Sequence, residues 1–233
     1  EKHPIFFNHS DIKRILPLPL RLDLVLQADY LFDMGTGDAA ASLREMNLTD
    51  HFLDFFGLRD CGNVRKNPKM LPRNGGRTPI RDQFRRIRKE GGSKHVILLN
   101  WKASCRMRDL PPDTLLFLAD EFDRVVFIVA QPRNYFKEVE DAISAHGDRI
   151  IDLSGHMNDL EDYICTISEC DAVVSTDTST GHLAEAVGKP SLTVFGAVNE
   201  DLRIRYYQKA HALRAEYIGK SCSSPCARNK AAD

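Results

Sequence analysis

Cys170-Asp-Ala-Val-Val-Ser-Thr-Asp-Thr-Ser-Thr-Gly-His-Leu-Ala-Glu-Ala-Val-Gly-Lys-Pro-Ser-Leu-Thr-Val-Phe-Gly196 is the stretch from which the fold can be worked out. The apolar run 172–174 is typical of a strand buried on both faces. Residues 177–181 form a polar turn, and the helical spacing of the next apolar residues predicts a helix over 182–187. Glycine and proline then end this helix, and 191–195 predicts a second buried strand. The polar turn therefore lies at the carboxyl end of a strand, where open α/β sheets bind ligands.

The polar turn is suited to an anion, and phosphate is the usual one. A helix start presents unpaired N–H groups and a partial positive charge. Gly181 would let a ligand approach the backbone, and His182 could add a proton-dependent donor. In the alternative interpretation, Asp177 and the hydroxyls only cap the helix, and the turn alone leaves both open. The hydroxyls belong to Thr178, Ser179 and Thr180.

Strands and helices alternate before this unit. The apolar patterns predict strands over 95–99, 125–130 and 150–153, and helices over 112–122, 135–144 and 159–168. Short connections between alternating strands and helices imply a parallel sheet between layers of helices. The fold class predicted from the sequence is therefore α/β.

The loop after the first of these strands carries three cations, Lys102, Arg106 and Arg108. It also follows the carboxyl end of a strand, so we expect it to face the same crevice as the polar turn. Cations at this place would stabilise the negative charge that develops on a diphosphate leaving group. The alternative is that they are surface charges flanking a turn.

Composition limits the classes of partner. The chain has 233 residues, a net charge of −1 and 42% hydrophobic residues, which is ordinary for a globular protein and gives no overall attraction to nucleic acid or membranes. Residues 59–94 are basic but contain Phe84 as their single aromatic residue, so we interpret them as an exposed linker, partly helical over 80–89, rather than a nucleic-acid surface.

The sequence also suggests the cellular compartment of the protein. No apolar run approaches the ~20 residues of a membrane-spanning helix, and residues 1–4 lack the order of a signal peptide. The six cysteines do not form the dense pattern of a disulfide scaffold. These features predict a cytoplasmic protein with at most peripheral membrane association.

From Ser175 to Pro190 the sequence resembles the ADP-heptose:lipopolysaccharide heptosyltransferases, glycosyltransferase family nine. The resemblance rests on the Asp-Thr turn, on His-Leu-Ala, on Gly-Lys-Pro and on the strand that ends in Phe195-Gly196. It implies a GT-B fold and inverting transfer, without a cofactor or metal, of a sugar from a nucleotide-diphospho donor, with an ADP-sugar favoured. The implied acceptor is a lipopolysaccharide-type or other glycan, or a lipid-linked saccharide.

The resemblance also implies roles for single residues. Ser104 and Arg108 would hold the donor diphosphate together with 178–181, and Arg108 would stabilise the transition state. Asp177 and His182 would brace the turn or touch the donor. The loop ending in Asn158 would contact the base, and Glu138 would bind the ribose, with a helix-surface carboxylate as its alternative. The family has a tryptophan where this chain has Leu110.

The amino-terminal part resembles the end of the family's first domain. Residues 28–33 are similar to its last strand, and 47–58 to the helix that leads into the second domain. We therefore expect the tail of an acceptor-side domain with its connecting helix over 1–58, a basic linker over 59–94, a donor-binding domain over 95–220 and a carboxyl-terminal tail over 221–233. The resemblance places the catalytic base in the missing part of the first domain, so this chain would be a fragment or a reduced variant, and no base can be named.

Two other hypotheses remain. The first is a binding module that holds a nucleotide sugar without transferring it. The second is a dinucleotide enzyme, because Gly35–Ala40 fits a G-x-G-x-x-A fingerprint. This fingerprint needs a following strand that ends in an acidic residue, whereas an amphipathic helix over 48–58 follows, so a simple turn is favoured. Cys222 and Cys226 are half of a possible metal or disulfide site.

Overall fold

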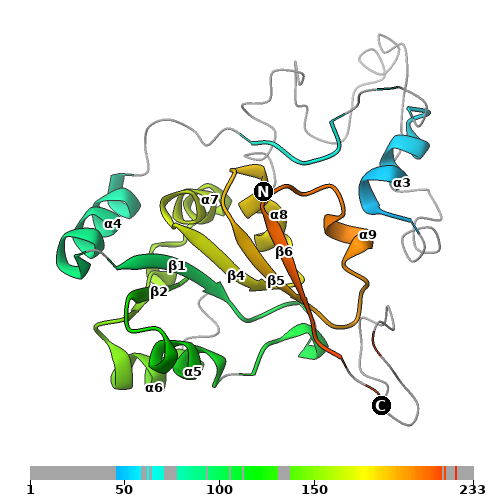
Figure 1. Cartoon of the computed structure of the whole chain (residues 1–233). Helices are drawn as coiled ribbons and strands as arrows, with labels where there is room; N and C mark the ends of the chain where they lie inside the picture. The colour runs from blue at the N-terminus through cyan, green and yellow to red at the C-terminus, as the bar shows by residue number, and fades with distance from the viewer. Residues whose placement is uncertain are drawn as a thin grey trace.

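A parallel sheet forms the centre of the computed structural model, which describes residues 46–58, 62, 65–70, 78–92, 94–104, 106–111, 113–130, 137–216, 218 and 224 (Figure 1). The described sheet has six strands in the order β3-β2-β1-β4-β5-β6, and every neighbouring pair is parallel. The chain adds strands toward one edge of the sheet up to β3 and then toward the other edge from β4 onward. The boundary between β1 and β4 is therefore the switch point of an open α/β sheet. The strands are β1 (His95–Asn100), β2 (Val125–Val129), β3 (Ile150–Asp152), β4 (Ala172–Thr176), β5 (Ser191–Phe195) and β6 (Ala210–Arg214).

Helices cover both faces of the sheet, and alternate strand residues enter two separate cores. Val96 and Leu98 pack into the core under α4 (Thr78–Gly91), α7 (Leu160–Glu169) and α8 (Ser179–Ala186). Leu99, on the opposite face of β1, packs into the core under α5 (Thr114–Glu121) and α6 (Lys137–His146). Because both faces are buried, the central strands have nearly continuous apolar sequences. The predicted α/β class is confirmed.

Most predicted elements lie within a few residues of the observed ones. Helix α8 begins at Ser179, earlier than expected, because Thr178 already acts as its N-cap. Strand β6 and the short helix α9 (Asp201–Ile204) were not predicted. All residues of β6 after Ala210 are exposed, so this edge strand lacks the apolar run that marks a buried strand.

Helix α4 corrects the interpretation of residues 59–94 as an exposed linker. Phe84 is 1% exposed and lies in the same core as Ile80 and Ile87. The basic residues occupy the opposite side of the helix, where Arg85 and Arg88 are exposed. The prediction of an exposed segment is wrong for 78–91, because the many charges obscured an apolar stripe at helical spacing. The boundary of the donor-binding domain stays a prediction.

Helix α3 (Leu48–Phe55) lies beside α9 at the β6 side of the molecule (Figure 1). Asn47 caps α3 and also donates its side-chain amide to the Asp201 carbonyl at 2.7 Å. Asp50 accepts hydrogen bonds from Lys66 at 2.8 Å and from Tyr206 at 2.7 Å. The predicted helix near 48–58 is thus confirmed. The predicted strand near 28–33 and the Gly35–Ala40 turn lie outside the described residues.

None of the helices that the structure describes is long and apolar enough to cross a lipid bilayer.

Candidate functional site

A cavity of about 590 Å³ opens where β1 and β4 end. Four segments line it: the end of β1 with the loop that follows, the residue after β2, the start of α7 with its preceding loop, and the first turn of α8. The two loops that the sequence expected to share a crevice therefore do so. The lining residues are Asn100, Lys102, Ala103, Ser104, Arg108, Ala130, Met157, Asn158, Asp159, Leu160, Tyr163, Thr178, Ser179 and Thr180.

The polar turn lines this cavity through Thr178, Ser179 and Thr180. Thr178 has an extended backbone (φ −142°), and its hydroxyl accepts the Thr180 N–H at 3.4 Å, so α8 starts at Ser179. The first N–H groups of a helix have no partner within the helix and carry its positive partial charge. Ser179 is exposed here, whereas Thr180 is buried. The turn both caps the helix and presents its start to the cavity, so the two interpretations of the sequence are compatible.

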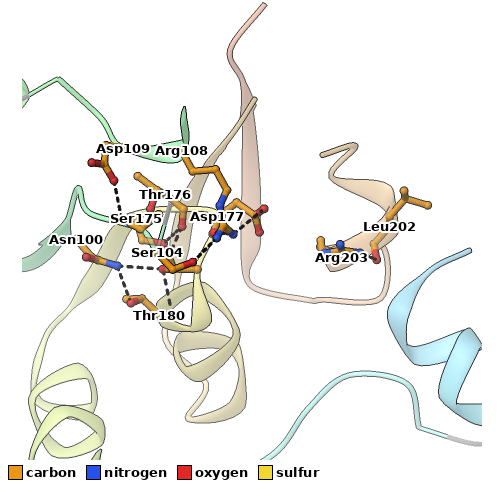
Figure 2. A network of polar contacts seen from close by, with 12 residues as sticks. Asn100, Ser104, Arg108, Asp109, Ser175, Thr176, Asp177, Thr180, Leu202 and Arg203 are labelled. Carbon is orange, nitrogen blue, oxygen red and sulfur yellow. Dashed lines mark hydrogen bonds and ion pairs between the residues drawn. The ribbon is translucent and has the colours of Figure 1, made fainter. Parts of the chain in front are cut away.

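Asn100, the last residue of β1, joins the strand to this turn. Its amide nitrogen donates to the Thr178 hydroxyl at 3.0 Å. It also donates to the Thr180 hydroxyl at 2.8 Å (Figure 2). Tyr163, from α7, places its hydroxyl 2.8 Å from that of Thr180. Burial raises the pKa of Tyr163 to about 12, so the phenol keeps its proton at neutral pH.

Arg108 joins the loop after β1 to the polar turn. One of its terminal nitrogens donates to the Asp177 carbonyl at 2.8 Å, and the other donates to the Ser104 hydroxyl at 2.7 Å (Figure 2). The Asp177 carboxylate lies 3.6 Å from the guanidinium. The Arg108 side chain is 19% exposed and lines the cavity. A cation is thereby fixed beside the positive end of α8.

Lys102 adds a second cation to the cavity wall. It forms an ion pair with Asp109 at 3.4 Å, and Asp109 also accepts the Ala103 N–H at 2.8 Å. These bonds give the loop its shape. The side chain of Arg106, the third cation expected here, lies outside the described residues. Arg108, Lys102 and the α8 dipole together favour an anionic ligand.

Gly181 is needed for the packing of α8 on the sheet. It is buried, and a Cβ built on it would lie 2.7 Å from the Thr193 hydroxyl on β5. Its missing side chain therefore faces the sheet and not the cavity, and the expectation that a ligand approaches its backbone stays a prediction. The glycine instead allows α8 to pack closely on β5.

His182 lies outside the cavity lining. Its Nδ1 is 2.6 Å from the Tyr207 hydroxyl, and the two rings pack edge to face. Burial lowers the pKa of His182, which favours its neutral form. Of the two predicted roles, the geometry favours bracing the turn, while contact with a donor stays a prediction.

Residues 75–232 match the sequence model of glycosyltransferase family 9 (heptosyltransferase). The chain belongs to this family. The match covers about two thirds of the sequence and includes α4, which agrees with the position of α4 in the core. No curated protein matches the sequence of this family 9 chain.

Two solved structures support the fold. A glycosyl transferase family 9 protein from Veillonella parvula superposes with a TM-score of 0.58 at 13% identity, over 73% of this chain and 49% of that protein. ADP-heptose LPS heptosyltransferase II from E. coli superposes with a TM-score of 0.51 at 17% identity, over 70% of this chain and 53% of that protein. At such identities the likeness concerns the fold alone, and it agrees with the expected GT-B type. The chain thus spans about half the length of each structure.

Four candidate residues from the sequence analysis remain to be placed. Asn158 lines the cavity, and both its backbone and side-chain nitrogens donate to Asp162, at 3.0 and 3.1 Å. Glu138 lies in the first turn of α6, and its side chain is outside the described residues. Cys222 and Cys226 are also outside them. Within the described part of the chain, no group of three or more His, Cys, Asp or Glu side chains is arranged to hold a metal ion.

Sequence reasoning missed Asn100 and Tyr163. Asn100 had a usable signal, because it is the polar residue that directly ends the apolar run of β1. Tyr163 had none, because its approach to Thr180 depends on how α7 packs against α8.

Proposed function

We propose that this chain forms the donor-binding part of a glycosyltransferase that takes a sugar from a nucleoside-diphosphate donor, with an ADP-sugar of the heptose type favoured. The observation that carries the proposal is Arg108, held between Ser104 and the Asp177 carbonyl at the start of α8. A guanidinium, hydroxyls and a helix start around one cavity suit a diphosphate. The E. coli structure with the same fold is named as an ADP-heptose heptosyltransferase, which supports this choice of nucleotide and sugar.

The proposed chemistry is cleavage of the bond between the anomeric carbon and the diphosphate oxygen. As that bond breaks, negative charge builds up on the leaving diphosphate. Arg108 and the α8 dipole would stabilise this charge more strongly in the transition state than in the bound donor. A saccharide hydroxyl, from a glycan or a lipid-linked acceptor, would attack from the opposite side and invert the anomeric centre. The base that takes its proton is not assigned to a described residue.

A second candidate is a module that binds the nucleotide sugar and does not transfer it. The observation that favours it is the cavity lining, where the described residues supply anion-binding groups and none of them is assigned as a base for an acceptor hydroxyl. Binding of ADP with no turnover on any saccharide acceptor would support this second function.

Isothermal titration of the full chain with ADP, UDP and NAD tests the site. We expect ADP to bind more tightly than UDP or NAD. Arg108→Gln should weaken ADP binding by about tenfold or more, because a charge-assisted bond to phosphate is worth roughly 1.5–3 kcal/mol. Arg85→Gln, an exposed arginine paired with Asp82 on α4, is the matched control and should bind as the wild type does. Equal ADP affinity in both variants, or tighter binding of NAD, would contradict the proposal.

A further inference from the structure

The protons of the Asn100 amide determine the direction of the hydrogen bonds in the polar turn. An amide nitrogen carries two protons and no acceptor. Asn100 directs these protons to two different hydroxyl oxygens, those of Thr178 at 3.0 Å and Thr180 at 2.8 Å. Both hydroxyls must therefore act as acceptors on the side that faces β1. Figure 2 shows the Asn100 side chain pointing at Thr180 across the end of the sheet.

Thr178 is left with a proton to donate. Its oxygen already accepts from Asn100 and, at 3.4 Å, from the Thr180 N–H. Among the described residues, the acceptor for its own proton is the Thr176 carbonyl, at a long 3.3 Å. A phosphate oxygen in the cavity would be a better acceptor, since hydroxyl bonds to anions shorten to about 2.5–2.7 Å.

Thr180 and Tyr163 form a pair with one proton to spare. Their hydroxyls are 2.8 Å apart, and either can be the donor. Because Thr180 already accepts from Asn100, one of the two protons fills the bond between them. The other has no acceptor among the described residues and can turn to the cavity, which both residues line.

We infer that Asn100 is a positioning residue, which fixes the hydroxyls of Thr178 and Thr180 as acceptors toward the sheet so that protons remain to be donated to the diphosphate of the donor. This inference rests on the proposed function. It assigns Asn100 an effect on the phosphates that it exerts through the two threonines. Asn100 would therefore select for the charged part of the ligand and not for its base.

Titration of Asn100→Ala with ADP and with adenosine tests this role. Loss of the orienting donor should weaken ADP binding by about tenfold, the scale of one hydrogen bond, and leave adenosine binding within about twofold. In a Thr178→Val/Thr180→Val background, Asn100→Ala should change ADP binding by no more than about twofold, because the hydroxyls through which it acts are gone.

Asn100→Asp has the same shape and provides a second measurement if the alanine variant does not fold. Its carboxylate accepts both hydroxyl protons and should weaken ADP binding more than alanine does, with partial recovery toward pH 4 as the carboxyl gains a proton. Equal losses for ADP and adenosine, or an unchanged effect of Asn100→Ala in the double-valine background, would overturn the role of Asn100 alone. A wild-type chain that binds no nucleoside diphosphate would overturn the proposed function and this inference together.

Discussion

Gly181 shows how one absent side chain fixes the position of the site. A methyl group there would lie 2.7 Å from the Thr193 hydroxyl, so α8 could not stay at its present distance from β5. We expect Gly181→Ala to lower the free energy of unfolding by about 1–2 kcal/mol, because overpacking outweighs the better helix propensity of alanine. Urea unfolding followed by circular dichroism would measure the loss.

The matched control is Gly155→Ala, since a Cβ at Gly155 would have no atom within 4 Å. It should leave the free energy of unfolding nearly unchanged. Adding Thr193→Ala to Gly181→Ala should recover part of the lost stability, because it removes the oxygen that clashes. Gly181→Ala with wild-type stability but weakened ADP binding would return the glycine to the role first expected from the sequence.

Thr178 allows a test of the hydroxyl itself. Thr178→Val keeps the shape of the side chain but removes its donor, and we expect ADP binding to weaken by roughly 1–3 kcal/mol. Thr178→Ser keeps the hydroxyl and should stay within about 0.5 kcal/mol of wild type. The valine variant also loses its helix cap, at about 1 kcal/mol of stability, so calorimetry should be done well below its unfolding temperature. Equal ADP affinity in the two variants would argue against a hydroxyl–phosphate bond.

At the scale of elements, a buried carboxylate joins α8 to the segment that leads into β6. Glu185, 5% exposed, accepts the backbone N–H groups of Gln208 and Lys209, both at 2.9 Å. Glu185→Gln replaces one acceptor by a donor, and we expect unfolding to become easier by about 1–3 kcal/mol. Glu90→Gln, in the exposed pair with Arg86, should cost less than about 0.5 kcal/mol under the same urea titration. Similar losses for the two variants would show that Glu185 contributes no more than a surface charge.

His182 should make the free energy of unfolding depend on pH. Because burial lowers its pKa below the ordinary 6.5, the unfolded chain binds more protons than the folded chain in mildly acidic solution. The contribution of His182 to stability is therefore present above about pH 6.5 and is lost as the pH falls toward the lowered folded value. Urea unfolding at several pH values between 5 and 8 should reveal this slope.

The same titration on His182→Gln should give a flatter profile, whereas His211→Gln, at an exposed position on β6, should keep the wild-type slope. An identical slope in His182→Gln would assign the pH dependence to other groups.

The elements also show which parts of the fold can be predicted from sequence. The strands β1, β2 and β4 were predictable, because burial on both faces requires continuous apolar runs. Helix α4 was predicted only in part, since its charges dominate the composition while three buried residues fix its position. Strand β6 was not predictable, because its pairing with β5 depends on backbone bonds and leaves its side chains exposed.

For the site, the sequence predicted the two loops but not how they are joined. Helix-start chemistry and the position after a strand were enough to identify the polar turn and the loop that carries Arg108, whereas Ser104 came from the resemblance to the family. The contacts of Asn100 and Tyr163 depend on packing between elements that are distant in sequence. The close packing of Gly181 on β5 was not predicted, because a glycine near a ligand turn can face either the ligand or the sheet, and the sequence does not distinguish the two.

At the scale of the whole molecule, a ligand that binds only the folded chain raises its stability. At a concentration one hundred times its dissociation constant, ADP should add about 2.7 kcal/mol. For a chain of this size, that corresponds to a rise of roughly 5–10 °C in the unfolding temperature. Differential scanning calorimetry with and without ADP checks it, with Arg108→Gln as the variant that should show the smaller rise. An equal rise in both would place the bound nucleotide away from Arg108.

The pairing of β1 with β4 also has a consequence for folding during synthesis. Asn100 at the end of β1 and Thr180, which follows β4, are hydrogen-bonded to each other and are 80 positions apart in the sequence. During synthesis β1 can pair with β2, and β2 with β3, at an early stage, but the other edge of β1 stays open until β4 has emerged from the ribosome. Such long-range parallel pairing folds slowly and leaves an edge open to wrong partners. The ligand cavity would thus be among the last parts to form, and we expect newly made chains to depend on chaperones until β4 closes that edge.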